Sequence, residues 1–256
     1  MRSELLTFID PLFYVYPAIM GGPPSSGITW LDDDRWIGRE IKFDEPTPSR
    51  WRIVRKIHER EILHLEWEVK KRGWRAEGRG VFLCTDTRGN ESVVKVRLQI
   101  PYMGTYFTSS TERAKQAIHD MGKSFRFEID ALRCLTQAGC SSSPALLGWK
   151  RETQSNTDWV PGGYIEYILM ERMPGVRPPP YWQPMEERDR LLKAFKEAYL
   201  ECMACGRVHL DEGTRNIIWD DRSGKCYIID WEDSLETTPE DTWEDRLYKT
   251  YLLQWD

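Results

Sequence analysis

Hydrophobic and polar residues alternate most clearly between residues 64 and 100. The segment HLEWEV (64–69) alternates between the two classes, and VFLCTD (81–86) and SVVKVRLQI (92–100) are rich in residues that favour strands. The polar sequence TRGNE (87–91) between the last two segments is typical of a tight turn. We therefore predict three strands here, the second and third of which form a hairpin.

Other segments show the 3.6-residue period of an amphipathic helix. We predict one helix from Ser49, and others over 111–139, 185–205 and 238–255. Gly139 and Gly206 end the second and third of these helices, and Thr238 and Pro239 begin the last one. The apolar positions behind these predictions are Trp51, Val54, Ile57 and Ile62; Phe127, Ala131 and Leu135; Leu192, Phe195 and Tyr199; and Trp243, Leu247, Tyr251 and Trp255.

Two further strands are predicted around ALLGWKRE (145–152) and YIEYILMERM (164–173), before MPG (173–175) breaks the pattern and the stiff connector PPPYWQP (178–184) follows. Residues 1–48 are rich in Pro and Gly and are expected to be irregular. This order divides the chain into an N-terminal extension with a helix (1–60), a strand-rich part (61–175) and a helix-rich part (176–256).

Composition narrows the class of protein. The 256 residues are 40% hydrophobic with a mean hydropathy of −0.60, and no apolar run reaches membrane-spanning length, so we expect a soluble cytoplasmic protein without a signal peptide. A net charge of −5 does not favour a DNA-binding protein, and the basic segments RWRIVRKIHER (50–60) and KKRGWR (70–75) are interpreted as exposed faces.

The six cysteines do not form a dense disulfide framework. Cys202 and Cys205 make a CxxC, but it lies inside a predicted helix, and the chain has no second CxxC and only four histidines. A zinc site is therefore not favoured, and we expect reduced thiols.

The segment HLDEGTRNIIWDDRSGKCYIID (209–230) holds the candidate chemistry. Asp211 and Asn216 stand five positions apart, and two short strand-like runs around the turn DDRSGK then lead to Asp230. Phosphoryl transfer needs a carboxylate that holds the attacking hydroxyl and oxygen ligands for Mg²⁺. The segment therefore indicates a phosphotransferase.

The pattern HxDxxxxN at His209–Asn216, followed by a hydrophobic strand ending in Ile229-Asp230-Trp231-Glu232, resembles the catalytic centre of the protein-kinase-like superfamily. It is most similar to small-molecule phosphotransferases of the aminoglycoside-phosphotransferase type and to short kinase-like proteins of fungi. The resemblance implies an α+β, two-lobed protein-kinase-like fold with a strand-rich N-lobe and a short, truncated helical C-lobe. It also implies that Asp211 orients the acceptor hydroxyl and that Asn216 and Asp230 bind Mg²⁺.

Upstream residues extend the resemblance in the right order. Lys95 stands in the middle of the apolar strand SVVKV, where a buried lysine needs an anionic partner. The resemblance makes Lys95 the contact to the ATP phosphates and Glu128, on the following helix, its partner. It makes Glu171 to Met173 the interlobe hinge, whose backbone would meet adenine.

The chain also departs from the kinase pattern. Gly73, Gly78 and Gly80 in the turn predicted before VFLCTD do not make GxGxxG, so phosphate binding by that loop is not implied. Only 26 residues follow Asp230, which disfavours a conventional protein kinase with a peptide platform. Glu232 and Asp233 fit either further contacts to Mg²⁺ or substrate, or a solvated acidic turn.

Three functions therefore stay open. The first is an ATP- and Mg²⁺-dependent phosphotransferase acting on a small molecule. The second is a kinase-fold biosynthetic enzyme with other chemistry, similar to the arginine-containing cyclodipeptide synthases of fungal secondary metabolism, which use aminoacyl-tRNA; Asp211 would then bind a guanidinium or amine, and the basic region 50–75 would meet tRNA. The third is a pseudokinase that binds without turnover.

Overall fold

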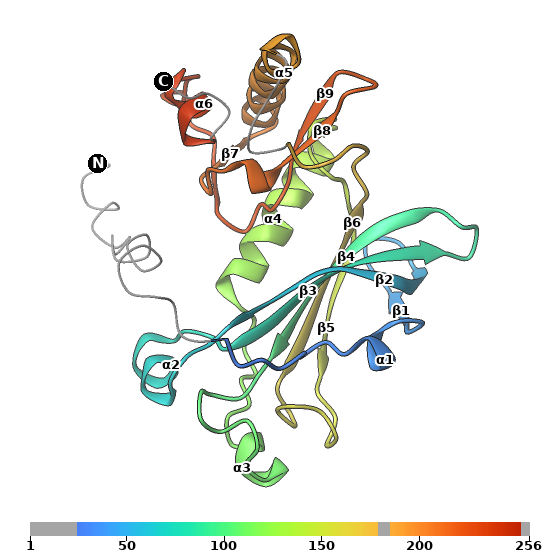
Figure 1. Cartoon of the computed structure of the whole chain (residues 1–256), viewed down its shortest axis with the longest axis vertical. Helices are drawn as coiled ribbons and strands as arrows, with labels where there is room; N and C mark the ends of the chain where they lie inside the picture. The colour runs from blue at the N-terminus through green and yellow to red at the C-terminus, as the bar shows by residue number, and fades with distance from the viewer. Residues whose placement is uncertain (1–24, 179–184, 252–256) are drawn as a thin grey trace.

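A six-stranded antiparallel sheet forms the centre of the computed structural model, which describes residues 25–178 and 185–251 (Figure 1). The strand order is β1-β2-β3-β4-β6-β5. The strands are β1 (Glu40–Phe43), β2 (Ser49–Ile62), β3 (Glu77–Asp86), β4 (Glu91–Gln99), β5 (Leu146–Thr153) and β6 (Tyr164–Glu171).

The predicted hairpin between residues 81 and 100 is confirmed as β3 and β4. Its turn is held by the Asp86 carboxylate, which accepts the backbone N–H groups of Arg88 and Asn90 at 2.8 and 2.9 Å. The strands predicted around 145–152 and 164–173 are also confirmed, as β5 and β6.

The helix predicted from Ser49 is wrong, because this segment is strand β2. Trp51 and Ile53 are buried on one side of the strand, whereas Val54 and Ile57 are exposed. The predicted helical face therefore does not exist. The expected boundary at residue 60 also falls inside β2, and the expected irregular extension contains β1 and the short helix α1 (Asp33–Trp36) in its described part.

The strand predicted at 64–69 is wrong as well. The segment enters helix α2 (Glu66–Arg72), which connects β2 to β3. The Glu68 carboxylate accepts the N–H of Leu65 at 2.8 Å, and Gly73 ends the helix in the left-handed conformation at φ 67°. End capping at both termini thus outweighs the strand-like alternation.

The long helix predicted over 111–139 is divided into α3 (Ser110–Ala114) and α4 (Lys123–Gln137). Phe127 was expected on the buried face of α4, but it is 54% exposed, and Phe125 is fully buried instead. Ala131 and Leu135 are buried as predicted, and Gly139 follows the helix with φ 71°.

The helix-rich end of the chain begins with α5 (Met185–Ala204), which confirms the predicted helix. The helix predicted over 238–255 is shorter in the described residues: α6 spans only Arg246–Thr250, and the Thr238 N–H donates instead to the Asp241 side chain. Trp255 and most of the 178–184 connector lie outside the described residues. Two small sheets complete this end: β7 (Arg207–His209) with β10 (Ser234–Glu236), and β8 (Ile217–Asp220) with β9 (Lys225–Ile228).

Apolar side chains gather in two buried clusters. One lies between the sheet and the N-terminal segment that carries Trp30 and Trp36, and the other joins α4, α5, the β8–β9 hairpin and α6. Helix α4 runs from the sheet toward α5 and the hairpin (Figure 1). The predicted mixture of helices and strands in an α+β fold is confirmed, while the two-lobed kinase-like architecture stays a prediction. Among the described residues, no helix is long and apolar enough to span a membrane.

Candidate functional site

Lys95 stands at the centre of a charged cluster between the sheet and α4. It lies in the middle of β4, and its ammonium donates to the carboxylate of Glu128 on α4 and, at 2.6 Å, to Oδ1 of Asp230 after β9. The Lys95 side chain is 17% exposed and that of Asp230 is 26% exposed. The structure thus brings three predicted site residues, from distant parts of the sequence, into direct contact.

Arg97 extends this cluster on the same face of β4, two residues after Lys95. Its guanidinium donates to Oε2 of Glu128 at 2.7 Å and lies 2.9 Å from Oε2 of Glu232. The Arg97 side chain is only 5% exposed and that of Glu128 only 1%, so their charges are almost completely removed from water. Each buried carboxylate therefore depends on a fixed cation.

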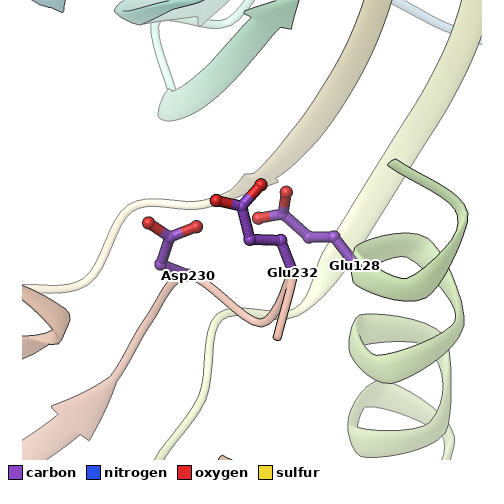
Figure 2. Close-up of side chains that lie close together, drawn as sticks. All are labelled: Glu128, Asp230 and Glu232. Atoms are coloured by element: carbon purple, nitrogen blue, oxygen red, sulfur yellow. The ribbon is translucent and has the colours of Figure 1, made fainter. Parts of the chain in front are cut away.

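Three carboxylates converge at this point. Figure 2 shows the side chains of Glu128, Asp230 and Glu232 close to one another. One carboxylate oxygen from each lies within 4.8 Å of the other two. Glu232 also accepts from Arg79 of β3 at 2.8 Å. The predicted alternative of a solvated acidic turn at Glu232 is therefore wrong, because its carboxylate is bound by two buried or half-buried guanidinium groups.

The backbone of Asp230 is unusual. Its φ is 67°, and it is the only non-glycine residue with a positive φ in the described ranges. Such conformations are costly for residues with a Cβ and persist where the surroundings impose them. This conformation fixes the direction of the carboxylate toward Lys95.

His209 supplies part of that constraint. Its Nε2 lies 3.0 Å from the carbonyl oxygens of both Ile229 and Asp230, and Nδ1 lies 2.8 Å from the Tyr251 hydroxyl. Carbonyl oxygens only accept, so Nε2 carries the proton and Nδ1 accepts from Tyr251. Burial lowers the pKa of His209, which favours this neutral form. The imidazole therefore links Tyr251, the residue after α6, to the two backbone carbonyls that flank the Cα of Asp230.

Asp211 and Asn216 form a second group next to the first. The Asn216 amide donates to Oδ2 of Asp211 at 2.8 Å and to its carbonyl at 2.7 Å, and the exposed Arg215 binds the other carboxylate oxygen. The Asn216 carbonyl accepts the N–H of Ile229 at 2.9 Å. This backbone hydrogen bond places Asn216 beside the residue that precedes Asp230.

The electrostatics keep the central carboxylate charged. Burial disfavours the charged form of Asp230, but the ammonium of Lys95 holds the pKa of Asp230 well below its usual range. Burial alone would lower the pKa of Lys95. The negative charges of Asp230 and Glu128 outweigh this effect and raise the pKa. Both groups are therefore ionised at neutral pH.

Hard divalent cations such as Mg²⁺ prefer oxygen ligands, and only some of the oxygen-bearing side chains in this site are free of bound cations. Glu128 and Glu232 are taken by Arg97, so the carboxylate cluster as a whole is not a free metal site. Asp230 is partly exposed, and Asn216 has an amide oxygen that is not used in its bonds to Asp211. These two residues therefore stay the candidate ligands for Mg²⁺.

Gly78 and Gly80 do not belong to a phosphate-binding turn. Both are buried within β3, where a Cβ on Gly78 would lie 2.8 Å from the Cβ of Trp30. Leu31 occupies the corresponding space over Gly80. The turn predicted here is wrong, because these glycines allow the N-terminal segment to pack closely on the sheet.

The predicted hinge residues lie away from this cluster. Ile168 of β6 pairs with Lys95 of β4, and Glu171 ends β6 three residues further on. Three residues span about 10 Å along a strand. Its N–H donates to the Ala145 carbonyl, and Met173 is partly buried. Neither position contacts Lys95 directly, so their role in adenine binding stays a prediction.

Sequence reasoning missed Arg97 and Arg79 as partners of the buried carboxylates. A signal for Arg97 was present, because residues two apart in a strand share a face and Arg97 follows Lys95 in that way. The contact of Tyr251 with His209 spans 42 positions and leaves no local pattern.

No protein-family model matches the chain, and no curated protein sequence matches it. Among solved structures, the chain is similar to the structure of vaccinia related kinase 3, with 9% sequence identity and a TM-score of 0.40. The alignment covers 78% of this chain and 52% of that one, so the chain spans about half of that kinase. The function is therefore argued from the geometry of the site.

Proposed function

We propose that the protein is a kinase-like phosphotransferase that uses ATP and Mg²⁺ to phosphorylate a small-molecule acceptor. The single observation that carries the proposal is the placement of Lys95 between Glu128 and Asp230, with the Asp211–Asn216 pair attached to the same backbone. This set combines a fixed ammonium, a charged carboxylate for a cation and a second carboxylate for the acceptor. Phosphoryl transfer requires little more from a protein than such positioning.

Lys95 is the anion-binding group in this proposal. Glu128 fixes its ammonium from one side, and the raised pKa keeps it charged. An ammonium that is already held at a partly exposed position can bind a phosphate oxygen without the entropy cost of ordering its long side chain. Mg²⁺ held by Asp230 and Asn216 would neutralise charge on the same phosphates.

Asp211 acts on the acceptor. Asn216 orients its carboxylate through Oδ2, and the carboxylate is partly exposed, so an acceptor hydroxyl can reach it. The exposed guanidinium of Arg215 must release Oδ1 for that hydroxyl to bind there. Asp211 would then accept the hydroxyl proton as the acceptor oxygen bonds to the γ-phosphorus of ATP, while the bond between that phosphorus and the leaving ADP oxygen breaks.

A turnover assay tests this proposal. The purified protein is incubated with ATP, Mg²⁺ and a panel of small molecules that carry hydroxyl or amine groups, and ADP formation is measured. Asp211→Asn should lower the rate by roughly 10²- to 10⁴-fold, because the general base is lost. Asp221→Asn, at an exposed ion pair in the β8–β9 turn, is the matched control and should keep full activity. Equal rates for Asp211→Asn and the native protein would overturn the role of Asp211.

A second candidate is aminoacyl transfer from tRNA, as in an arginine-containing cyclodipeptide synthase. The observation that favours it is the exposed basic surface of β2 and α2, where the guanidinium of Arg72 lies 5.6 Å from the ring centre of the exposed Trp67. Interleaved cations and aromatic rings suit RNA. The Asp211 carboxylate also binds a guanidinium already, that of Arg215.

Mass spectrometry separates the two candidates. Cells that express the protein are extracted, and the purified protein is incubated with arginyl-tRNA in parallel. An arginine-containing diketopiperazine in both the cell extract and the reaction with purified protein would favour aminoacyl transfer and would contradict the phosphotransferase proposal. Its absence, together with Asp211-dependent ADP formation, would support the phosphotransferase. Nucleotide binding without either product would indicate a non-catalytic binding protein.

A further inference from the structure

Two thiols from distant parts of the sequence meet between the end of α4 and α5. Cys140 follows the αL residue Gly139 that ends α4, and Cys202 lies in the last turn of α5. Their sulfur atoms are 3.7 Å apart. Cys140 is partly exposed, whereas Cys202 is 1% exposed. One thiol can therefore meet a small solute, and the other lies directly behind it.

The backbone around Cys140 is fixed against α5. The Cys140 N–H donates to the Leu135 carbonyl at 3.0 Å. The next residues, Ser141 and Ser142, both bind the carboxylate of Glu201, which is adjacent to Cys202 in the sequence. The approach of the two sulfur atoms is thus imposed by the surrounding hydrogen bonds and does not depend on a mobile loop.

The two thiols differ in acidity. The hydrogen bond from Cys202 lowers the pKa of Cys140 to about 7, helped by the N–H of Ser142 and opposed by burial. The pKa of Cys202 is raised, because it donates to Cys140 and is buried. At neutral pH, Cys140 is therefore partly a thiolate, which is the reactive form, and Cys202 keeps its proton.

We propose that Cys140 is a peroxide-reactive thiol and that Cys202 resolves its oxidised form into an intramolecular Cys140–Cys202 disulfide. The proposal is independent of the phosphotransferase, because neither thiol belongs to the charged cluster around Lys95. The co-reactant is a hydroperoxide such as hydrogen peroxide.

The chemistry proceeds in two balanced steps. The Cys140 thiolate attacks one peroxide oxygen, the O–O bond breaks, and the departing hydroxide takes up a proton to become water, which leaves a sulfenic acid on Cys140. The sulfur of Cys202 then loses its proton and attacks the Cys140 sulfur, and the sulfenic hydroxyl leaves with that proton as a second water. The two thiols are oxidised by two electrons in total, and one peroxide is reduced to two waters.

The bridge would join the end of α4 to the end of α5. Helix α4 carries Glu128 on the sheet side, whereas α5 packs on the β8–β9 hairpin that leads to Asp230. A covalent link between these helices therefore connects the two elements that position the charged cluster. Cys205 lies three residues after Cys202 and also lowers the pKa of Cys140, so it is the competing thiol.

Peptide mapping of the peroxide-treated protein tests the proposal. The native protein should lose the mass of two hydrogen atoms and yield a linked pair of tryptic peptides, 134–150 and 197–207. Each of these peptides holds two cysteines, so fragment ions must place the link at Cys140 and Cys202. A link through Cys205, or no link in excess peroxide, would overturn the proposal.

Two variants sharpen the result. Cys140→Ser should abolish both the mass loss and the fast consumption of peroxide. Cys134→Ser is the matched control, because Cys134 lies on the same tryptic peptide but donates to the Cys205 carbonyl rather than to a thiol. It should form the same link at the same rate. Retention of the link in Cys140→Ser, or its loss in Cys134→Ser, would contradict the assignment.

Discussion

Replacement of Arg97 by Met tests whether the buried charges around Lys95 depend on one another. The change keeps an unbranched apolar side chain about as long as the aliphatic stem of arginine and removes the guanidinium. It deletes the 2.7 Å hydrogen bond to Glu128 and the 2.9 Å ion pair with Glu232. Glu128, whose side chain is 1% exposed, would then share a single cation, Lys95, with Asp230.

The expected loss of stability is large. Breaking a buried ion pair by removing one partner costs about 3–5 kcal/mol, because the remaining buried carboxylates are poorly hydrated and only partly compensated by their other cations. At roughly 2–4 °C per kcal/mol for a chain of this size, the Tm should fall by about 6–20 °C. The same substitution at Arg172, whose pair with Glu91 is 49% and 43% exposed, should cost less than about 1 kcal/mol.

Urea unfolding followed by tryptophan fluorescence measures both variants. Adding Glu128→Gln to Arg97→Met should recover part of the loss, because it removes a partly compensated charge, and the double-mutant cycle gives the coupling between the two side chains. The reasoning is refuted if Arg97→Met costs no more than Arg172→Met. It is also refuted if the two changes in the cycle are simply additive.

Three further predictions follow from other parts of the structure. Burial lowers the pKa of His209 below 6.5, so the unfolded chain takes up a proton first as pH falls, and stability should decrease from about pH 7 to pH 5 by at most about 1.4 kcal/mol per pH unit. In urea unfolding at several pH values, His209→Gln should flatten that slope. Gly175→Ala should lower stability by more than about 1 kcal/mol, since φ is 103° and a Cβ would lie 2.6 Å from the carbonyl carbon of Trp219; an unchanged Tm would contradict this. A Cys140–Cys202 bridge closes a loop between positions 62 apart, so it should stabilise the protein by up to about 4 kcal/mol, and dithiothreitol should reverse this gain. Equal urea midpoints for the bridged protein with and without the reductant would contradict this.

The parts of the fold that sequence reasoning predicted are those with local signals. The β3–β4 hairpin combines strand-forming residues with the turn at Asp86–Asn90, and the β8–β9 hairpin combines the same elements around residues 220–225. Helix α5 has a stripe of apolar residues along its length, of which Phe195 and Tyr199 are buried. In each case, neighbouring residues alone determine the element.

The failures have a different physical origin. In β2, Trp51 and Val54 are spaced like a helical pair, and only pairing with β3 over almost the whole strand reveals that they face opposite sides. In α2, the capping by Glu68 and Gly73 decided the structure against the alternation. These outcomes depend on distant partners or on end capping, which the alternation of apolar residues does not record.

In the candidate site, too, some features follow from local sequence patterns and others depend on contacts between distant residues. Asp211, Asn216 and Asp230 could be named as candidates because their spacing along the chain is a recognisable pattern. The pairing of Lys95 with Asp230 connects residues 135 positions apart, and the αL backbone of Asp230 follows from contacts that only the folded chain provides. The sequence therefore indicated the residue types, and the fold supplied the constraints on their direction.

Isothermal titration calorimetry of ATP, with and without Mg²⁺, tests the central claim most directly. The native protein should bind ATP, and binding should be stronger with Mg²⁺. Lys95→Met should weaken that binding at least about 10-fold, which corresponds to the loss of roughly 1.4 kcal/mol from one charge-assisted contact. Lys150→Met, which removes another lysine paired with a carboxylate in the same sheet, should leave it unchanged. Equal affinity for ATP in the native protein and Lys95→Met, or no binding by the native protein at millimolar ATP, would contradict the account.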